Sequence, residues 1–130
     1  MDPFTRQIFS TGDENRAVAR LLAAQDASIA DAARRWATIS AFYAAVHYIN
    51  AWLWEHLQVE PRDHTERRVF VLTVSTLKPA ANAYVRLQDH GYDARYRIGV
   101  HISPEKLNEL FEGDLRTVRS IVIQSLNARQ

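Results

Sequence analysis

The sequence predicts an all-α protein, an antiparallel bundle of four to five helices that forms a single domain over residues 1–130. No glycine or proline falls between Gly12 and Pro61, and turns usually need such residues, so this half of the chain must be almost entirely helical. Two clear helix start signals follow, near Asp63 and near Ser103. The expected connections are short, which favours antiparallel packing.

The N-terminal half is expected to hold two helices. Residues 1–13 are interpreted as an irregular lead-in, with a turn at Gly12. One helix from 14 to 57 would be about 65 Å long, too long for a compact domain, so we place a break at 26–31, where Asp and Ser cluster. The second helix, 31–57, is apolar over most of its circumference and should be central and buried. Its inward face would carry Trp36, Ile39, Phe42, Val46, Ile49 and Leu53.

The C-terminal half should contain two more long helices. Asp63-His64-Thr65-Glu66 is a capping box that starts a third helix, expected to run from 64 to about 90. Pro79 should kink this helix or divide it in two, and His90-Gly91 is a stop signal. Ser103-Pro104-Glu105 starts the last helix, expected over 104–127.

Composition excludes several classes of function. There is no cysteine, so a disulfide framework, a thiolate nucleophile and a cysteine zinc site are excluded. The motifs of a phosphate-binding glycine loop and of a zinc protease are absent, and we expect no metal or other cofactor. A net charge of +1 argues against a broad nucleic-acid-binding surface but not against a local basic patch. Without an apolar run of roughly 20 residues or a signal peptide, we expect a cytoplasmic protein with no membrane partner.

A polar seam follows one face of the second helix. Ser40, Tyr43, His47 and Asn50 recur at three- and four-residue steps. They could line a ligand or nucleotide cleft, with Tyr43 and His47 as binding residues. The preferred alternative is a set of core polar groups, each hydrogen bonded to a neighbouring helix.

A charged cluster opens the third helix. His64 and Arg68 are four residues apart on one face, and Arg62 and Arg67 lie beside them. Arginines at a helix N-terminus can hold an anion such as phosphate. The alternative is a solvated turn in which Glu66 neutralises an arginine.

A second basic and aromatic cluster precedes the last helix. Arg95 and Arg97 could stabilise phosphate charge, Tyr96 could stack on a base, and His101 could act as general acid or base. The alternative is a surface loop whose arginines pair with nearby carboxylates. If the third helix is nearly straight, His64 and Arg95 lie about 40 Å apart. They could share a site only if Pro79 bends the chain sharply, or across a dimer interface.

Four segments between about Arg34 and Tyr96 carry a resemblance to a known family. They are Ser40–Tyr48, Pro61–Arg67, Tyr84–Leu87 and Ala94–Tyr96. In order and spacing they resemble the HEPN superfamily, the nucleotide-binding domains of higher eukaryotes and prokaryotes, and in particular its stand-alone members.

The resemblance implies a helical bundle that is commonly a homodimer. Many members are metal-independent ribonucleases, often toxins partnered by a nucleotidyltransferase antitoxin, whose motif is an arginine and a histidine four to six residues apart. Arg95 and His101 match that spacing and would be the catalytic pair, although Tyr96 stands where a polar residue is usual. RNA or nucleotide binding is therefore our first hypothesis. A non-catalytic helical interaction or dimerisation module is the alternative.

Overall fold

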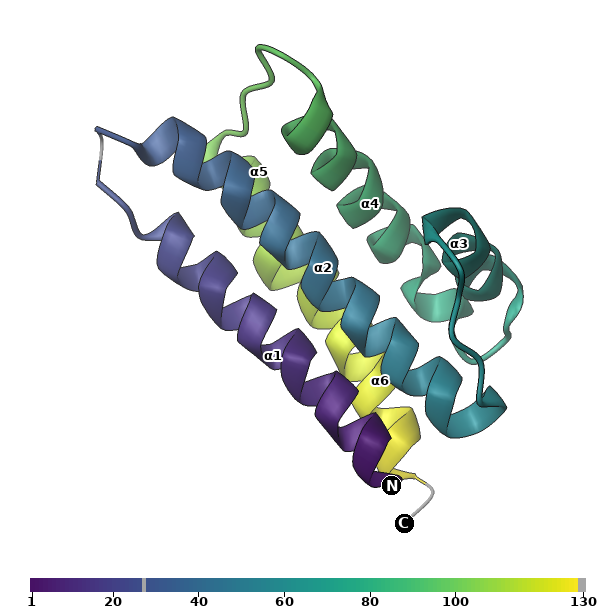
Figure 1. Ribbon diagram of the computed structural model, residues 1–130. Coiled ribbons are helices and arrows are strands. Elements are labelled where there is room, and N and C mark those ends of the chain that lie inside the picture. Colours follow the sequence, from purple (N-terminus) through teal and green to yellow (C-terminus); the bar gives the residue numbers. More distant parts are fainter. Residues whose placement is uncertain (27, 129–130) are drawn as a thin grey trace.

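The computed structural model describes residues 1–26 and 28–128, and within these ranges it is helical and contains no strand, as the sequence predicts. Helix α2 (Ala30–Leu57) lies at the centre. Figure 1 shows α1 (Pro3–Ala23) and α4 (Ala81–Tyr96) along two of its sides, with the last helical stretch along a third and the two termini at the same end. None of the described helices is both long and apolar enough to cross a membrane.

Helix α1 begins much earlier than the sequence suggests. The expected irregular lead-in over 1–13 is wrong, because the Asp2 side chain caps the helix at the Phe4 amide and Pro3 occupies its first position. Gly12 lies inside this helix. A Cβ there would come within 2.7 Å of the Tyr48 ring, so the glycine allows α1 to approach α2 closely and does not form a turn.

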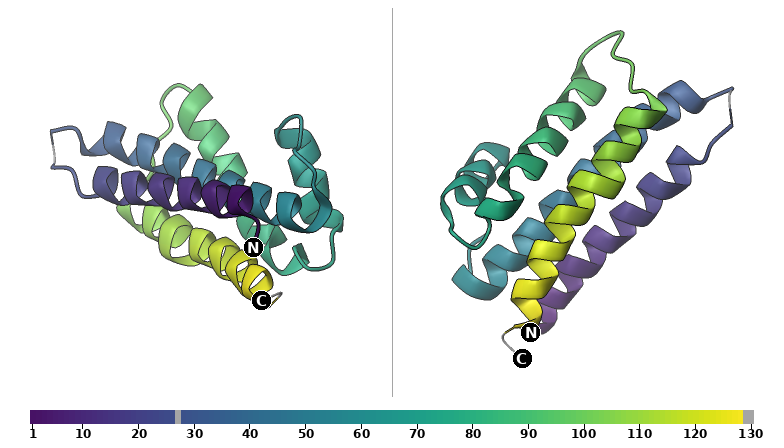
Figure 2. Two further views of the ribbon diagram at one scale, coloured as in Figure 1. Left: turned by 60° about the horizontal axis from the view of Figure 1, so that its bottom comes forward. Right: turned by 180° about the vertical axis from the view of Figure 1, so that it is seen from behind.

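Helix α2 has the central position predicted for it. α1 ends at Ala23 and α2 begins at Ala30, so the expected break is present but starts earlier than 26–31, and residue 27 within it lies outside the described residues. Both views of Figure 2 show α2 between the other long helices. Its small buried residues, such as Ala41 and Ala44, admit these neighbours. Trp36, predicted to face inward, is 58% exposed, because the buried side of α2 at this level is formed by Ala33 and Ala37 instead.

The expected third helix is two helices. α3 (His64–Thr73) ends at Val74, whose backbone is extended, and the chain then turns through a short 3-10 segment, η1 (Lys78–Ala80), into α4. Division was one of the two outcomes expected at Pro79. The stop at His90-Gly91 is wrong, because α4 continues to Tyr96. A Cβ on Gly91 would lie 3.0 Å from the Phe42 Cβ, so this glycine also serves close helix packing.

The last helical stretch starts where predicted and contains an unexpected π-helical segment. Ser103 accepts a hydrogen bond from the Lys106 amide at 3.0 Å and begins α5 (Pro104–Asn108). The π segment η2 (Glu109–Leu115) follows, and α6 (Arg116–Asn127) completes the bundle. Such segments are rare and are often found at functional sites.

Asp13 of α1 forms hydrogen bonds with residues of α2 and α6, and its ionisation should make the free energy of unfolding depend on pH. It accepts hydrogen bonds from the Tyr48 hydroxyl at 2.5 Å and from Arg119 Nε at 2.9 Å. Burial raises the pKa of Asp13, but the bonds and charges of its partners outweigh this and leave the pKa lowered. Its stabilising contribution is therefore present above about pH 3.9, the ordinary value in an unfolded chain, and is lost as pH falls through the lower folded pKa. We expect Asp13→Asn to unfold in less urea at pH 7 and to lose less stability than wild type between pH 4 and pH 2. Equal acid dependence of the two proteins would contradict this role.

Candidate functional site

A pocket of about 150 Å³ lies between α2, the start of α3 and the second half of α4. We call it the His64–Arg95 pocket. It is lined by Phe42, Tyr43, His64, Gln88, Asp89, Tyr92, Arg95 and Tyr96. Four residues singled out from the sequence, Tyr43, His64, Arg95 and Tyr96, therefore meet in one cavity.

His64 and Arg95 come together because the chain reverses between α3 and α4. The separation of about 40 Å expected for a straight helix is wrong. Both residues line the same pocket, and the positive charge of Arg95 contributes to the lowered pKa of His64. The sharp bend that the sequence left open is made by the turn at 74–80.

Arg95 is surrounded by tyrosines. Its Nη1 donates a hydrogen bond to the Tyr43 hydroxyl at 2.9 Å, and its guanidinium lies over the Tyr96 ring, 5.2 Å from the centroid. The rings of Tyr92 and Tyr96 are in contact, with centroids 5.0 Å apart. Within 1–26 and 28–128, Arg95 forms no ion pair with a carboxylate. The pocket therefore presents a cation that is not neutralised, next to aromatic surface.

A buried arginine, Arg67, contacts the imidazole ring of His64. Asp63 caps α3 through the Glu66 amide and so places His64 at the first position of the helix. Arg67 Nη1 lies 2.7 Å from His64 Nδ1. Burial and the charge of Arg67 hold the pKa of His64 below its ordinary value, against a weaker opposite effect of Asp63. His64 is therefore neutral near pH 7.

The remaining arginines near the pocket are paired. Arg68 binds Asp89 at 3.0 Å, and Asp89 lines the pocket. Arg97 binds Asp93 at 2.9 Å and does not line the pocket. The pairing of Arg97 with Asp93 agrees with the alternative given for the basic cluster before the last helix, in which its arginines pair with nearby carboxylates. Arg62 likewise binds Glu66, at 2.7 Å.

His47 belongs to a different cavity. Together with Asn50, Glu60 and other residues, it lines a hollow of about 280 Å³ between α1, α2 and the loop before α3. Burial and the charge of Arg67 lower the pKa of His47. The polar seam of α2 is thus divided, since Tyr43 faces one cavity and His47 the other. Tyr43 and Asn50 are each hydrogen bonded to an arginine of a neighbouring helix, as the preferred alternative predicted.

His101 is not among the residues that line the His64–Arg95 pocket. It lies in the loop before α5, with 65% of its side chain exposed, and its Nδ1 is 2.6 Å from Asp31 Oδ1. Within the described chain, the structure does not bring Arg95 and His101 into one cavity.

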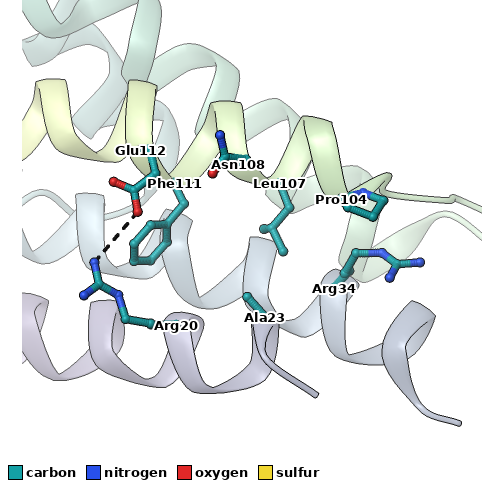
Figure 3. Close-up of a pocket in the computed structure, with 8 residues that line it drawn as sticks. All are labelled: Arg20, Ala23, Arg34, Pro104, Leu107, Asn108, Phe111 and Glu112. Atoms are coloured by element: carbon teal, nitrogen blue, oxygen red, sulfur yellow. Dashed lines mark ion pairs between the residues drawn. The ribbon is translucent and has the colours of Figure 1, made fainter. Parts of the chain in front are cut away.

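The sequence did not single out two features of the folded chain. One is the burial of Arg67, whose only sequence signal is its position three residues after His64, on the same face of the helix. The other is a groove of about 320 Å³ between α1, α2 and α5–η2. Figure 3 shows the ion pair of Arg20 and Glu112 at one end of this groove and Arg34 at the other. No local pattern predicts it, because its lining comes from separate helices.

The described residues contain no cluster of three or more side chains of the types that could hold a metal ion. Comparisons with protein-family models, with curated proteins and with solved structures found no match to this chain.

Proposed function

We propose that this chain is a HEPN-like helical domain that binds RNA or a nucleotide at the His64–Arg95 pocket. The observation that carries the proposal is the meeting of His64 and Arg95, from separate helices, in a pocket that also holds three tyrosines. A guanidinium without a carboxylate partner suits a phosphate, and tyrosine rings suit a stacked base. A small site of this kind is also compatible with a net charge of only +1.

The proposal includes metal-independent cleavage of RNA, as the family resemblance implies. The RNA 2′-hydroxyl would attack the adjacent phosphate, and the bond between phosphorus and the 5′-oxygen of the next nucleotide would break, leaving a 2′,3′-cyclic phosphate and a 5′-hydroxyl. His101 would take the proton of the 2′-hydroxyl or give one to the leaving 5′-oxygen, with solvent water exchanging the other proton, and Arg95 would stabilise charge on the phosphorane. Because His101 does not line the His64–Arg95 pocket of its own chain, we propose that a homodimer completes the site across its interface. A nucleotidyltransferase antitoxin is the partner that the resemblance implies.

The binding proposal is tested by a single substitution. Arg95→Ala removes the exposed guanidinium of the pocket, and we expect the affinity for a short single-stranded RNA to fall roughly tenfold or more, as for the loss of one charge-assisted contact. Fluorescence anisotropy of labelled RNA at fixed salt measures this. Arg116→Ala is the matched control, since Arg116 is an exposed arginine of α6 outside the pocket. Equal affinities of the two variants would refute the assignment of the pocket.

A second function, a non-catalytic interaction or dimerisation module, is favoured by apolar exposure at one end of the bundle. Leu21, Ile29 and Trp36 flank the connection from α1 to α2 and are each more than half exposed. Such side chains often mark an interface between proteins. A chain that forms a dimer but binds no RNA would support this function in place of the first.

A further inference from the structure

Arg67 is a buried cation without an anion. It is 6% exposed, and it donates hydrogen bonds from Nε to Asn50 Oδ1 at 2.8 Å and from Nη1 to His64 Nδ1 at 2.7 Å. Both acceptors are neutral. No carboxylate of residues 1–26 and 28–128 forms an ion pair with Arg67. A buried charge of this kind costs stability unless something compensates it.

Most other arginines of the described residues do have such partners. Ion pairs with carboxylates are formed by Arg20, Arg34, Arg35, Arg62, Arg68, Arg86, Arg97 and Arg119. Among the described residues, the arginines without such a partner are Arg6, Arg16, Arg67, Arg95 and Arg116. Arg67 is the buried member of this set, and it contacts His64, which lines the same pocket as Arg95. An anion bound at His64 would therefore lie near both guanidinium groups.

The contact with Arg67 also fixes the proton on His64. A guanidinium has only donors, so His64 Nδ1 must accept, and the proton of the neutral ring is then on Nε2. Among the described residues, Nε2 has no hydrogen-bond acceptor. His64 thus offers one unused N–H donor at a pocket that Arg95 also lines.

Gln88 adds an unused acceptor. Its Oε1 is buried and has no hydrogen-bond partner within the described chain, and Gln88 lines the same pocket. The oxygens of a phosphodiester carry no proton and cannot donate to it, whereas a ribose hydroxyl or a base amino group can. A ligand that satisfies the whole pocket therefore carries both a phosphate and a donor group, as a nucleotide does.

We infer that the His64–Arg95 pocket is the phosphate subsite for a nucleotide unit, in which His64 Nε2–H and the Arg95 guanidinium hold the phosphate oxygens and Gln88 accepts from the sugar or base. Arg67 is a positioning residue. It holds His64 in one tautomer, and its buried charge is compensated when the phosphate binds. This inference rests on the proposed function and specifies the ligand group and the residues that hold it.

The first test needs only the wild-type protein. The charged groups that act on His64 are Arg67, Arg95 and Asp63. In a ¹⁵N-histidine NMR titration, we expect His64 to remain the neutral Nε2–H tautomer from pH 8 to below pH 6.5 and to shift on addition of uridine 3′-monophosphate. Inorganic phosphate should shift the same signal but bind more weakly, because it has no sugar or base to contact Gln88 and the tyrosine rings. An Nδ1–H tautomer, or a His64 signal unmoved by the nucleotide, would overturn the inference.

The second test separates a positioning role from a structural one. Arg67→Met should bind uridine 3′-monophosphate at least tenfold more weakly and raise the pKa of His64 toward its ordinary value. Its resistance to urea should be equal to or higher than that of wild type, because an uncompensated buried charge has been removed. Arg116→Met should leave affinity and the His64 pKa unchanged. Wild-type affinity in Arg67→Met would overturn the positioning role.

Failure of this inference can be distinguished from failure of the proposed function. RNA binding that leaves the His64 signal unmoved would refute the subsite and leave RNA binding intact. A nucleotide that shifts His64 in a protein that binds no RNA would support the subsite and refute RNA as the ligand.

Discussion

Gly12→Ala is expected to lower the free energy of unfolding by about 1–2 kcal/mol, although alanine is the better helix former. The added Cβ would lie 2.7 Å from Tyr48 Cε1 and 3.2 Å from the Ala44 carbonyl oxygen. Tyr48 is fully buried, and its hydroxyl is bonded to Asp13, so the ring cannot move aside without disturbing the core. Overpacking of this kind costs more than the gain in helix propensity.

Gly113→Ala is the matched control for this prediction. Gly113 also lies in a helical segment, but a Cβ there would meet no atom within 4 Å. We expect this variant to be more stable than wild type, by up to about 1 kcal/mol. Urea unfolding of the three proteins measures both effects. A Gly12→Ala protein as stable as Gly113→Ala would show that α1 does not pack on α2 as described.

Cleavage of RNA in EDTA is expected to fall by about 100-fold or more in His101→Ala and in Arg95→Ala, because each substitution removes one member of the proposed catalytic pair. The His101→Ala protein would lack the group that transfers the proton. The Arg95→Ala protein would lack the guanidinium that stabilises the phosphorane. The measurement is the rate of cleavage of a labelled single-stranded RNA by wild type, the two variants and Arg116→Ala. Equal cleavage by all four proteins, or none by any, would remove the arginine–histidine mechanism.

The two functional residues also predict different binding behaviour. Arg95 lines the pocket and His101 does not. We therefore expect His101→Ala to keep near wild-type affinity for RNA while losing cleavage, whereas Arg95→Ala loses both. A mixture of the two inactive variants would regain activity only if one protomer supplies Arg95 and its partner supplies His101.

The parts of the fold set by local chemistry could be predicted from the sequence. The caps at Asp63 and Ser103 depend on residues within three positions, and both are present. Gly12 was interpreted as a turn and Gly91 as a helix stop, but each lies inside a helix, where a Cβ would crowd an aromatic residue of α2: Tyr48 for Gly12 and Phe42 for Gly91. Local rules cannot distinguish a glycine that ends a helix from one that lets another helix approach.

The site was only partly predictable for the same reason. Residue types identified Tyr43, His64, Arg95 and Tyr96, but their meeting depends on the reversal between α3 and α4. The turn at 74–77 contains no glycine, so the sequence did not show that the chain folds back before Pro79. Burial of Arg67 likewise depends on a residue far along the chain, since Arg67 is hydrogen bonded to Asn50 of α2.

The central claim is that RNA binds on the tyrosine-flanked surface of the His64–Arg95 pocket. Photocrosslinking of a short RNA that contains 4-thiouridine, followed by mass spectrometry of the crosslinked peptides, tests it most directly. We expect the crosslinks to map to Tyr92 and Tyr96 and to decrease when uridine 3′-monophosphate is added. Crosslinks confined to residues outside the pocket, and insensitive to the nucleotide, would contradict the account.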